Sequence, residues 1–250
     1  MRFISPIITQ VAKDFWKSAG GNSVFPCDIS GAVNLVLPID IVCLSELSLK
    51  KIQTWLTERK VFLDLEIDDR LLHGFILISK GSGFIFVNGT DTEEERRYTI
   101  AHEAGHFLLD YKRPREIAVK KLGESILEVM DGYREATNEE QIDGTLTSVS
   151  IRPYTHLLEK VGDGSFNNMD ILDSENDADA LALELLAPHA TVIKDTNPNR
   201  NKISFYDFKN RCYQVLRSKY LIPDSIAEAY SSKLVYVAIG SPSLADKLGF

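Results

Sequence analysis

A chain of 250 residues with 44% hydrophobic and 26% charged residues has an ordinary globular composition and is long enough to bury a sizeable core. Its 28 basic and 36 acidic residues give a net charge of -8, which repels phosphate backbones, so we expect no direct nucleic-acid partner. The longest apolar stretch is broken by Asn34, Pro38 and Asp40 and is too short to span a bilayer, so we expect no membrane partner.

Two features of the sequence favour the cytoplasm. Cys27, Cys43 and Cys212 are odd in number and form no CxxC pair, which is typical of reduced thiols that serve in packing. The amino-terminal segment reaches Lys13 and Asp14 too early for the apolar region of a signal peptide. We therefore expect a cytoplasmic protein.

The first part of the chain predicts two helices and then a hairpin. Apolar residues at helical spacing predict a helix over residues 6–18 and a second one from Leu47 to about Lys60. Residues 71–79 and 83–89 are short runs rich in branched and aromatic residues, and KGSG joins them. This pattern indicates an antiparallel hairpin.

The hairpin leads directly into a strongly signalled helix. Thr92 and Glu95 have the spacing of a capping box, and the acidic residues 93–95 lie where the helix dipole is positive. We expect this helix to run from about Glu93 to Tyr111 and to end at Pro114.

A helical insert is expected to follow this helix. Residues 116–130 carry apolar side chains at helical intervals, and Thr137 with Glu140 forms a second capping-box pattern. Residues 115–160 are therefore predicted to form ordered short helices rather than a disordered linker.

The rest of the chain is predicted to be mostly helical. A helix with Ser174 as its N-cap and acidic residues in its first turn should end before Pro188. Beyond it we expect helices at about 204–219 and 224–233, followed by a short strand in the apolar run LVYVAIG, residues 234–240.

Two of the five histidines lie in the sequence HEAGH, as His102 and His106. Positions i and i+4 share one face of a helix, so both imidazoles can face one metal ion. Glu103 then points beside the ion, where it can act as a general base toward a water molecule held there. Gly105 costs the helix about 1 kcal/mol relative to alanine, which suggests that another segment comes close to it.

A catalytic zinc ion needs a further protein ligand, which we expect on another helix. Glu175 is the best candidate, and Asp179, four residues later on the same face, is placed to accept the free N–H of a ligand histidine. Asp177 is the rival ligand. His156 and His189 are candidates for a second role, as donors to the oxyanion that forms in peptide hydrolysis.

Two segments of the sequence together resemble the ImmA/IrrE family of zinc metallopeptidases. They are RRYTIAHEAGHFLL and the pattern ExxADxLAxxLLxP, which starts at Glu175, and the resemblance is strongest over residues 72–190. It implies three zinc ligands and one general base, namely His102, His106, Glu175 and Glu103. It also implies a polypeptide substrate, because members of this family cleave transcriptional repressors. A repressor or antitoxin-like regulator is therefore the substrate that we expect.

These observations predict an α+β fold with a small antiparallel sheet packed on the HExxH helix of a gluzincin-like, zinc-dependent enzyme. We expect a helical segment over 1–60, a metallopeptidase core over 61–190 with the insert at about 115–160, and a C-terminal segment over 191–250. The rival hypothesis is a metal-containing regulatory binding protein with little or no peptidase activity. A structural zinc site needs four protein ligands and has no use for Glu103, which favours the enzyme.

Overall fold

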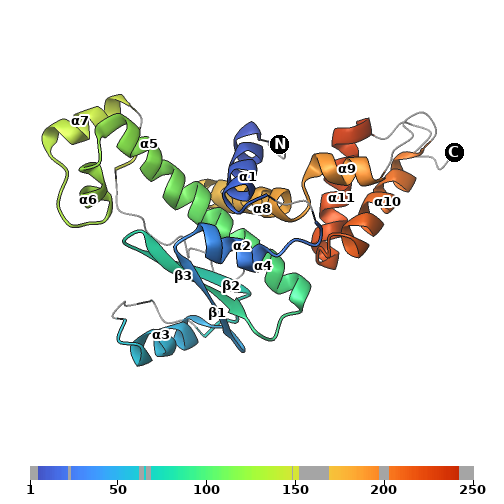
Figure 1. Ribbon diagram of the computed structural model, residues 1–250, viewed down its shortest axis with the longest axis horizontal. Coiled ribbons are helices and arrows are strands. Elements are labelled where there is room, and N and C mark those ends of the chain that lie inside the picture. Colours follow the sequence, from blue (N-terminus) through green and yellow to red (C-terminus); the bar gives the residue numbers. More distant parts are fainter. Residues whose placement is uncertain are drawn as a thin grey trace. The chain divides into compact units, whose positions relative to one another are not determined.

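The computed structural model describes residues 5–21, 24–61, 65, 69–147, 149–151, 169–196 and 203–241. It has the predicted α+β fold, in which a small sheet is combined with many helices (Figure 1). The chain forms two compact units, each of which combines segments that are separated in the sequence. The sheet unit consists of Leu37–Thr90 and His102–Asp179, and the helical unit of Met1–Val36, Asp91–Ala101 and Ala180–Phe250.

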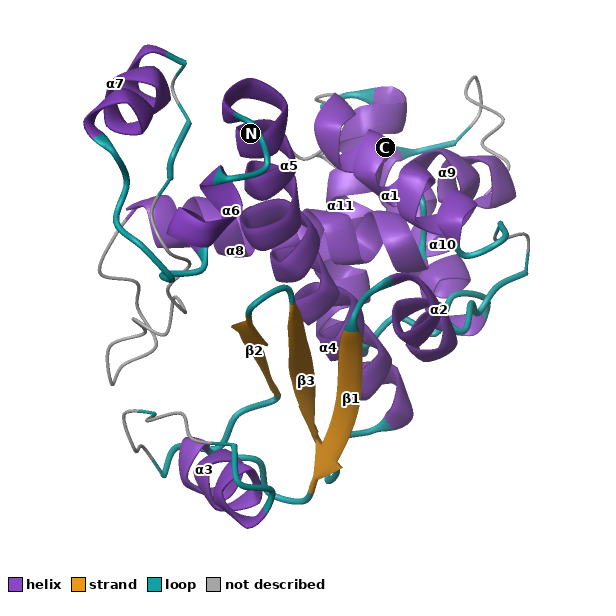
Figure 2. Cartoon of the chain, turned by 60° about the vertical axis from the view of Figure 1, so that its left-hand side comes forward, coloured by secondary structure: helices purple, strands orange, loops and turns teal. Residues whose placement is uncertain are grey.

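The sheet has three strands, β1 (Ile39–Leu44), β2 (Gly74–Ser79) and β3 (Ser82–Asn88), in the order β1-β3-β2 (Figure 2). Strands β2 and β3 form the predicted antiparallel hairpin. Strand β1 pairs in parallel with β3, so the sheet is mixed rather than purely antiparallel. The sequence did not predict β1 because a strand that pairs in parallel with a distant strand leaves no local hairpin signal.

A two-residue turn connects β2 and β3. Lys80 and Gly81 have φ angles of 51° and 89°, the left-handed values of a type I′ turn, whose twist matches that of the flanking strands. The N–H of Gly81 donates a hydrogen bond of 2.7 Å to the hydroxyl of Tyr111. The hairpin tip is therefore tied to the segment that follows the motif helix.

Helix α3 (Leu49–Glu58) covers one face of the sheet (Figures 1 and 2). The side chain of Ser48 caps its first turn by accepting a hydrogen bond from the N–H of Lys51. The shared core consists of Leu47, Leu49, Ile52, Leu56, Phe75, Leu77 and Phe86. Burial of each such side chain contributes about 1.5–3 kcal/mol to the free energy of folding. This core holds α3, the helix that the sequence predicted, against the sheet.

The motif helix does not end at Pro114, which corrects the prediction. Helix α4 (Glu93–His106) continues into a π-helical segment, η1 (Phe107–Lys112), and then into α5 (Arg113–Leu122), whose first turn contains the proline. In a regular helix the proline ring collides with the turn before it. The wider π turn pairs residues five apart and relieves that collision, so the helical path continues.

The predicted capping box of α4 is confirmed. The N–H of Thr92 donates to the carboxylate of Glu95 at 2.8 Å, and the N–H of Glu95 donates to the hydroxyl of Thr92 at 3.3 Å. The start of the motif helix is thus fixed by the hydrogen bonds that its sequence predicted.

The described part of the predicted insert consists of short helices with a small core of their own. After α5 come α6 (Ile126–Met130) and α7 (Asn138–Leu146). Their buried core residues are Ala118, Ile126, Val129 and Met130. The prediction of ordered short helices is confirmed as far as residue 147, while residues 152–160 lie outside the described part of the chain.

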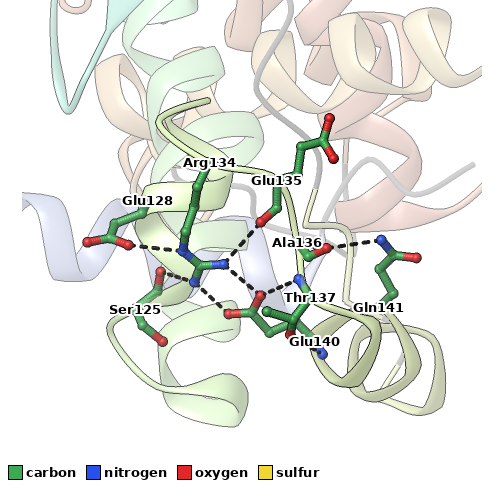
Figure 3. A network of polar contacts seen from close by, with 8 residues as sticks. All are labelled: Ser125, Glu128, Arg134, Glu135, Ala136, Thr137, Glu140 and Gln141. Carbon is green, nitrogen blue, oxygen red and sulfur yellow. Dashed lines mark hydrogen bonds and ion pairs between the residues drawn. The ribbon is translucent and has the colours of Figure 1, made fainter.

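Arg134 holds the loop between α6 and α7 together (Figure 3). Its guanidinium donates to both carboxylate oxygens of Glu140, at 2.6 and 2.8 Å, and to Glu128 at 2.9 Å. It also donates to the carbonyl oxygen of Ser125 at 2.9 Å. Glu140 completes the predicted capping box with Thr137, so one carboxylate serves both the loop and the helix start.

The helical unit contains α1 (Pro6–Ser18), α2 (Ile29–Val36), α9 (His189–Thr196), α10 (Phe205–Ser218) and α11 (Asp224–Ile239). The predictions of helices at residues 6–18 and 204–219 are confirmed. The strand predicted at residues 234–240 is wrong, because most of that run is the second half of α11.

The burial pattern of α11 explains why this run is helical. The buried positions follow the spacing i, i+3, i+4, i+7 and i+8 of a helix face. They are Ala227, Tyr230, Ser231, Leu234 and Val235. The branched and aromatic residues of the run favour a strand locally, but the continuing buried face determines the structure.

Two further expectations concern reduced cysteines and the absence of a membrane-spanning segment. All three cysteines are free thiols, and Cys27 and Cys212 are buried as packing residues, whereas Cys43 is exposed. Within the described ranges, none of the helices combines the length and the apolar character that crossing a bilayer requires.

We predict that Arg134→Gln loosens α7 in a pH-dependent way. Hydrogen bonds from Arg134, and then the bond from the backbone of Thr137, lower the pKa of Glu140 from 4.5 to about 2. This carboxylate therefore stabilises the folded segment fully above pH 4.5 and loses that effect as the pH falls toward 2. Amide hydrogen exchange in α7 should be faster in the variant than in the wild type at neutral pH.

The difference in exchange between variant and wild type should shrink as the pH falls toward 2, where Glu140 of the wild type becomes half protonated, and should disappear at lower pH. Arg211→Gln, a change of an exposed arginine on α10, serves as the control and should leave α7 unaffected. Equal amide exchange in α7 of the wild type and of Arg134→Gln at neutral pH would show that Arg134 does not stabilise this helix.

Candidate metal centre

His102 and His106 lie one turn apart near the end of α4, in the sheet unit. Their Nε2 atoms are 3.1 Å apart, and their ring planes meet at 80°. The two side chains are only 17% and 10% exposed. The structure thus directs both imidazoles at one shielded point.

Glu175 of α8 (Met169–Leu186) adds a carboxylate to this point. Its Oε2 lies 3.6 Å from Nε2 of His102, and its Oε1 lies 3.6 Å from Nε2 of His106. The three ligand atoms lie within 4.8 Å of one another. Asp177, the rival candidate, is exposed and is not part of this group.

Helix α8 begins at Met169, before the predicted start at Glu175, and Ser174 lies inside it. The predicted N-cap is wrong because the preceding turn is also helical and buries the side chain of Ile171. The free energy gained by this burial outweighs the local preference of serine for a cap. The hydroxyl of Ser174 instead donates to Oδ2 of Asp110 at 2.7 Å. The predicted end of the helix before Pro188 is confirmed.

Gly105 allows α8 to come close to the motif helix. A Cβ atom at this position would lie 3.1 Å from the carbonyl oxygen and 3.2 Å from the Cα of Ala178. These are backbone atoms, which cannot rotate away. The close approach that the glycine suggested is therefore present, and it brings Glu175 within reach of the two histidines.

Both histidines are also held on their second ring nitrogen. Nδ1 of His102 lies 2.8 Å from Oδ1 of Asp179, and Nδ1 of His106 lies 2.8 Å from Oδ2 of Asp110. Donation of the Nδ1 proton to a carboxylate leaves the Nε2 lone pair available for a metal ion. The sequence suggested Asp179 but not Asp110, although the four-residue spacing from His106 was a signal that could have identified it.

The charge distribution around the histidines suits a cation. Burial alone lowers the pKa of His102, but hydrogen bonds to Asp179 and Glu175 and the charges of Glu103 and Asp179 outweigh it and raise the pKa to about 10. Glu103 itself is only 8% exposed. Two imidazole nitrogens and a carboxylate at this spacing can share a proton, or they can bind a divalent ion that accepts nitrogen and oxygen ligands.

Of the two other candidate histidines, His189 lies among the described residues and is not part of this group. His189 begins α9 in the helical unit, and its Nδ1 lies 2.8 Å from Oε2 of Glu184, whose oxygen also accepts the backbone N–H of His189 at 3.2 Å. His189 therefore has a structural role, because its contacts with Glu184 hold the first turn of α9. His156 lies outside the described residues.

A histidine pair on one helix turn, a glutamate between them and a carboxylate from a second helix define an HExxH-type site. Residues 60–144 match the Peptidase_M78 family model, described as the IrrE N-terminal-like domain. This match supports the resemblance to the ImmA/IrrE family that the sequence indicated. The matched residues include both histidines, whereas Glu175 lies beyond them. Comparisons with curated proteins and with solved structures gave no match.

We predict that Gly105→Ala destabilises the protein. On an isolated helix this change is favourable by about 1 kcal/mol. Here the added methyl group meets the backbone of Ala178, so α8 must shift by a few tenths of an ångström and its packing is lost. The free energy of unfolding in denaturant, measured without metal, should fall, and an increase would show that the close helix contact is absent in solution.

Proposed function

We propose that this protein is a zinc-dependent metallopeptidase. The proposal rests on one observation, the convergence of His102, His106 and Glu175 within 4.8 Å next to the buried carboxylate of Glu103. The match of residues 60–144 to a peptidase family supports it independently of the geometry.

His102, His106 and Glu175 would hold the ion. Two imidazoles and one carboxylate form the ligand set of catalytic zinc sites that keep one position open for substrate. When bound, the ion supplies Lewis acidity, which polarises the scissile carbonyl group and makes water a better nucleophile. Asp179 would orient His102 through its hydrogen bond to Nδ1, which leaves Nε2 available as a ligand.

Glu103 is the group that we assign to proton transfer. It follows His102 directly on the helix, so its side chain points to the flank of the histidine pair rather than between the two rings. Its charge contributes to the raised pKa of His102, which supports this assignment. A buried carboxylate there can take the proton of the attacking water and pass it to the leaving amine. The rival hypothesis of a binding protein gives this carboxylate no task.

We further propose that the substrate is a specific regulatory protein, such as a transcriptional repressor or an antitoxin-like regulator, in the cytoplasm. The family resemblance supports a repressor. The insert supports narrow specificity, because α5 follows the motif helix after a single π turn and starts an ordered module with its own core. A module in this position can restrict which polypeptides reach the histidines.

A pair of substitutions separates metal binding from catalysis. We predict that Glu103→Gln keeps one zinc ion per chain but hydrolyses substrate more slowly by a factor on the order of 100 to 10,000, the usual contribution of a general base. His106→Ala should lose both zinc and hydrolysis. Zinc content by elemental analysis and kcat/KM on an identified substrate are the two measurements.

Glu139→Gln, on the exposed surface of α7, is the matched control and should resemble the wild type. Equal kcat/KM for wild type and Glu103→Gln would favour the binding-protein hypothesis. A wild type that holds no zinc after incubation with the ion would contradict the metal centre itself.

We predict that the intact protein cleaves few proteins in a cell extract. Incubation of the extract with wild type, and with Glu103→Gln as the background, should reveal a small number of new protein N-termini, concentrated in transcriptional regulators. Unfolded casein should remain largely intact. New N-termini spread over many unrelated proteins would point to a general housekeeping peptidase instead.

A further inference from the structure

Asp110 lies at the centre of a short chain of hydrogen bonds that ends at the metal centre. Its Oδ2 atom lies 2.8 Å from Nδ1 of His106 and accepts a second hydrogen bond, of 2.7 Å, from the hydroxyl of Ser174. The hydroxyl itself is 3.5 Å from the same ring nitrogen, so the carboxylate is the closer partner of the histidine. Ser174 directly precedes Glu175 on α8.

We propose that Asp110 is a positioning residue of the metal centre and that Ser174 fixes its carboxylate. Helix α8 would then both supply the ligand Glu175 and, through Ser174, orient the imidazole of His106 on the facing helix. This inference rests on the proposed metallopeptidase function, because it concerns the same ion.

The geometry explains how Asp110 would act on His106. A carboxylate at Nδ1 fixes the ring orientation and the tautomer and makes Nε2 a more basic ligand. One oxygen of the Asp110 carboxylate accepts hydrogen bonds from both an imidazole and a hydroxyl. Rotation of the carboxylate group is therefore restricted, because it would break a hydrogen bond to a partly buried donor. The ring of His106 thus contacts a carboxylate whose own orientation is fixed by Ser174.

The backbone that carries Asp110 is held in place as well. Asp110 lies in η1, and the next residue, Tyr111, accepts the hydrogen bond from the N–H of Gly81 at the hairpin tip. The guanidinium of Arg115 lies 4.7 Å from the centre of the Tyr111 ring, on its face. The π turn is therefore anchored to the sheet on one side and to α5 on the other, which fixes the direction of the Asp110 side chain.

The two histidine-anchoring carboxylates differ in their access to water. The side chain of Asp179 is 48% exposed, whereas that of Asp110 is 22% exposed. Water can more easily replace a carboxylate that solvent already reaches. Loss of Asp110 should therefore weaken metal binding more than loss of Asp179, although the sequence suggested only Asp179.

A zinc competition titration of the purified proteins tests the inference. Asp110→Ala should bind zinc about 10- to 100-fold more weakly than the wild type, the usual effect of removing a group that orients a ligand. Asp110→Asn keeps an acceptor without the charge and should lose less. Ser174→Ala removes one hydrogen bond and should lose about 2- to 10-fold. Asp179→Ala should fall between Ser174→Ala and Asp110→Ala.

Two controls and a spectroscopic measurement separate positioning from general stability. Asp143→Ala, on the exposed face of α7, and Ser218→Ala, on the exposed face of α10, should bind zinc as the wild type does. With cobalt in place of zinc, the visible absorption bands report ligand geometry. They should change in Asp110→Ala and remain unchanged in both controls.

The possible outcomes distinguish this inference from the function on which it rests. A wild type that binds neither zinc nor cobalt overturns the proposed function. A wild type that binds both, together with Asp110→Asn and Ser174→Ala proteins of unchanged affinity and cobalt spectrum, overturns only the role of Asp110. These two variants decide the matter even if Asp110→Ala does not fold. A lower unfolding free energy with unchanged zinc affinity would also overturn it, because it would make Asp110 a structural residue.

Discussion

The contact between Gly105 and the backbone of Ala178 is the constraint on which the candidate metal centre depends. Because no side chain separates the two helices there, α8 lies close enough for Glu175 to reach both histidines. The same approach sets Asp179 and Ser174 against partners on the facing helix. A single packing contact thus brings together a candidate ligand and two candidate orienting groups, and the geometry of the site depends on how these helices pack.

Much of the fold and of the site could be predicted because the signals are local. The capping box at Thr92, the hairpin and the histidine pair at i and i+4 each arise within a few residues, where spacing and chemistry determine geometry. Glu175 and Asp179 could be identified in the same way, since both lie on one helix face. Glu175 lies near both histidines and Asp179 near Nδ1 of His102, while the ligand role of Glu175 and the orienting role of Asp179 stay predictions.

The remaining features depend on contacts between distant residues, which no local pattern contains. Strand β1 pairs in parallel with β3, and α8 starts earlier than Ser174 because its preceding turn is buried. The path through Pro114 requires a π turn, which sequence spacing did not reveal. Asp110 is different, because its four-residue spacing from His106 is a local signal. Only its second partner, Ser174, lies on another helix, where the sequence predicted a cap.

The insert between the two halves of the site has a consequence for how such a protein can evolve. It has its own core and its own arginine clamp. The entropy of closing a loop grows only logarithmically, by about 0.6 kcal/mol for each doubling of length. Lengthening, shortening or replacing the insert therefore changes little in the free energy of bringing Glu175 to the histidines. Natural selection can therefore vary this segment while the residues of the candidate metal centre stay as they are. On the proposed function, such variation would change the choice of target protein.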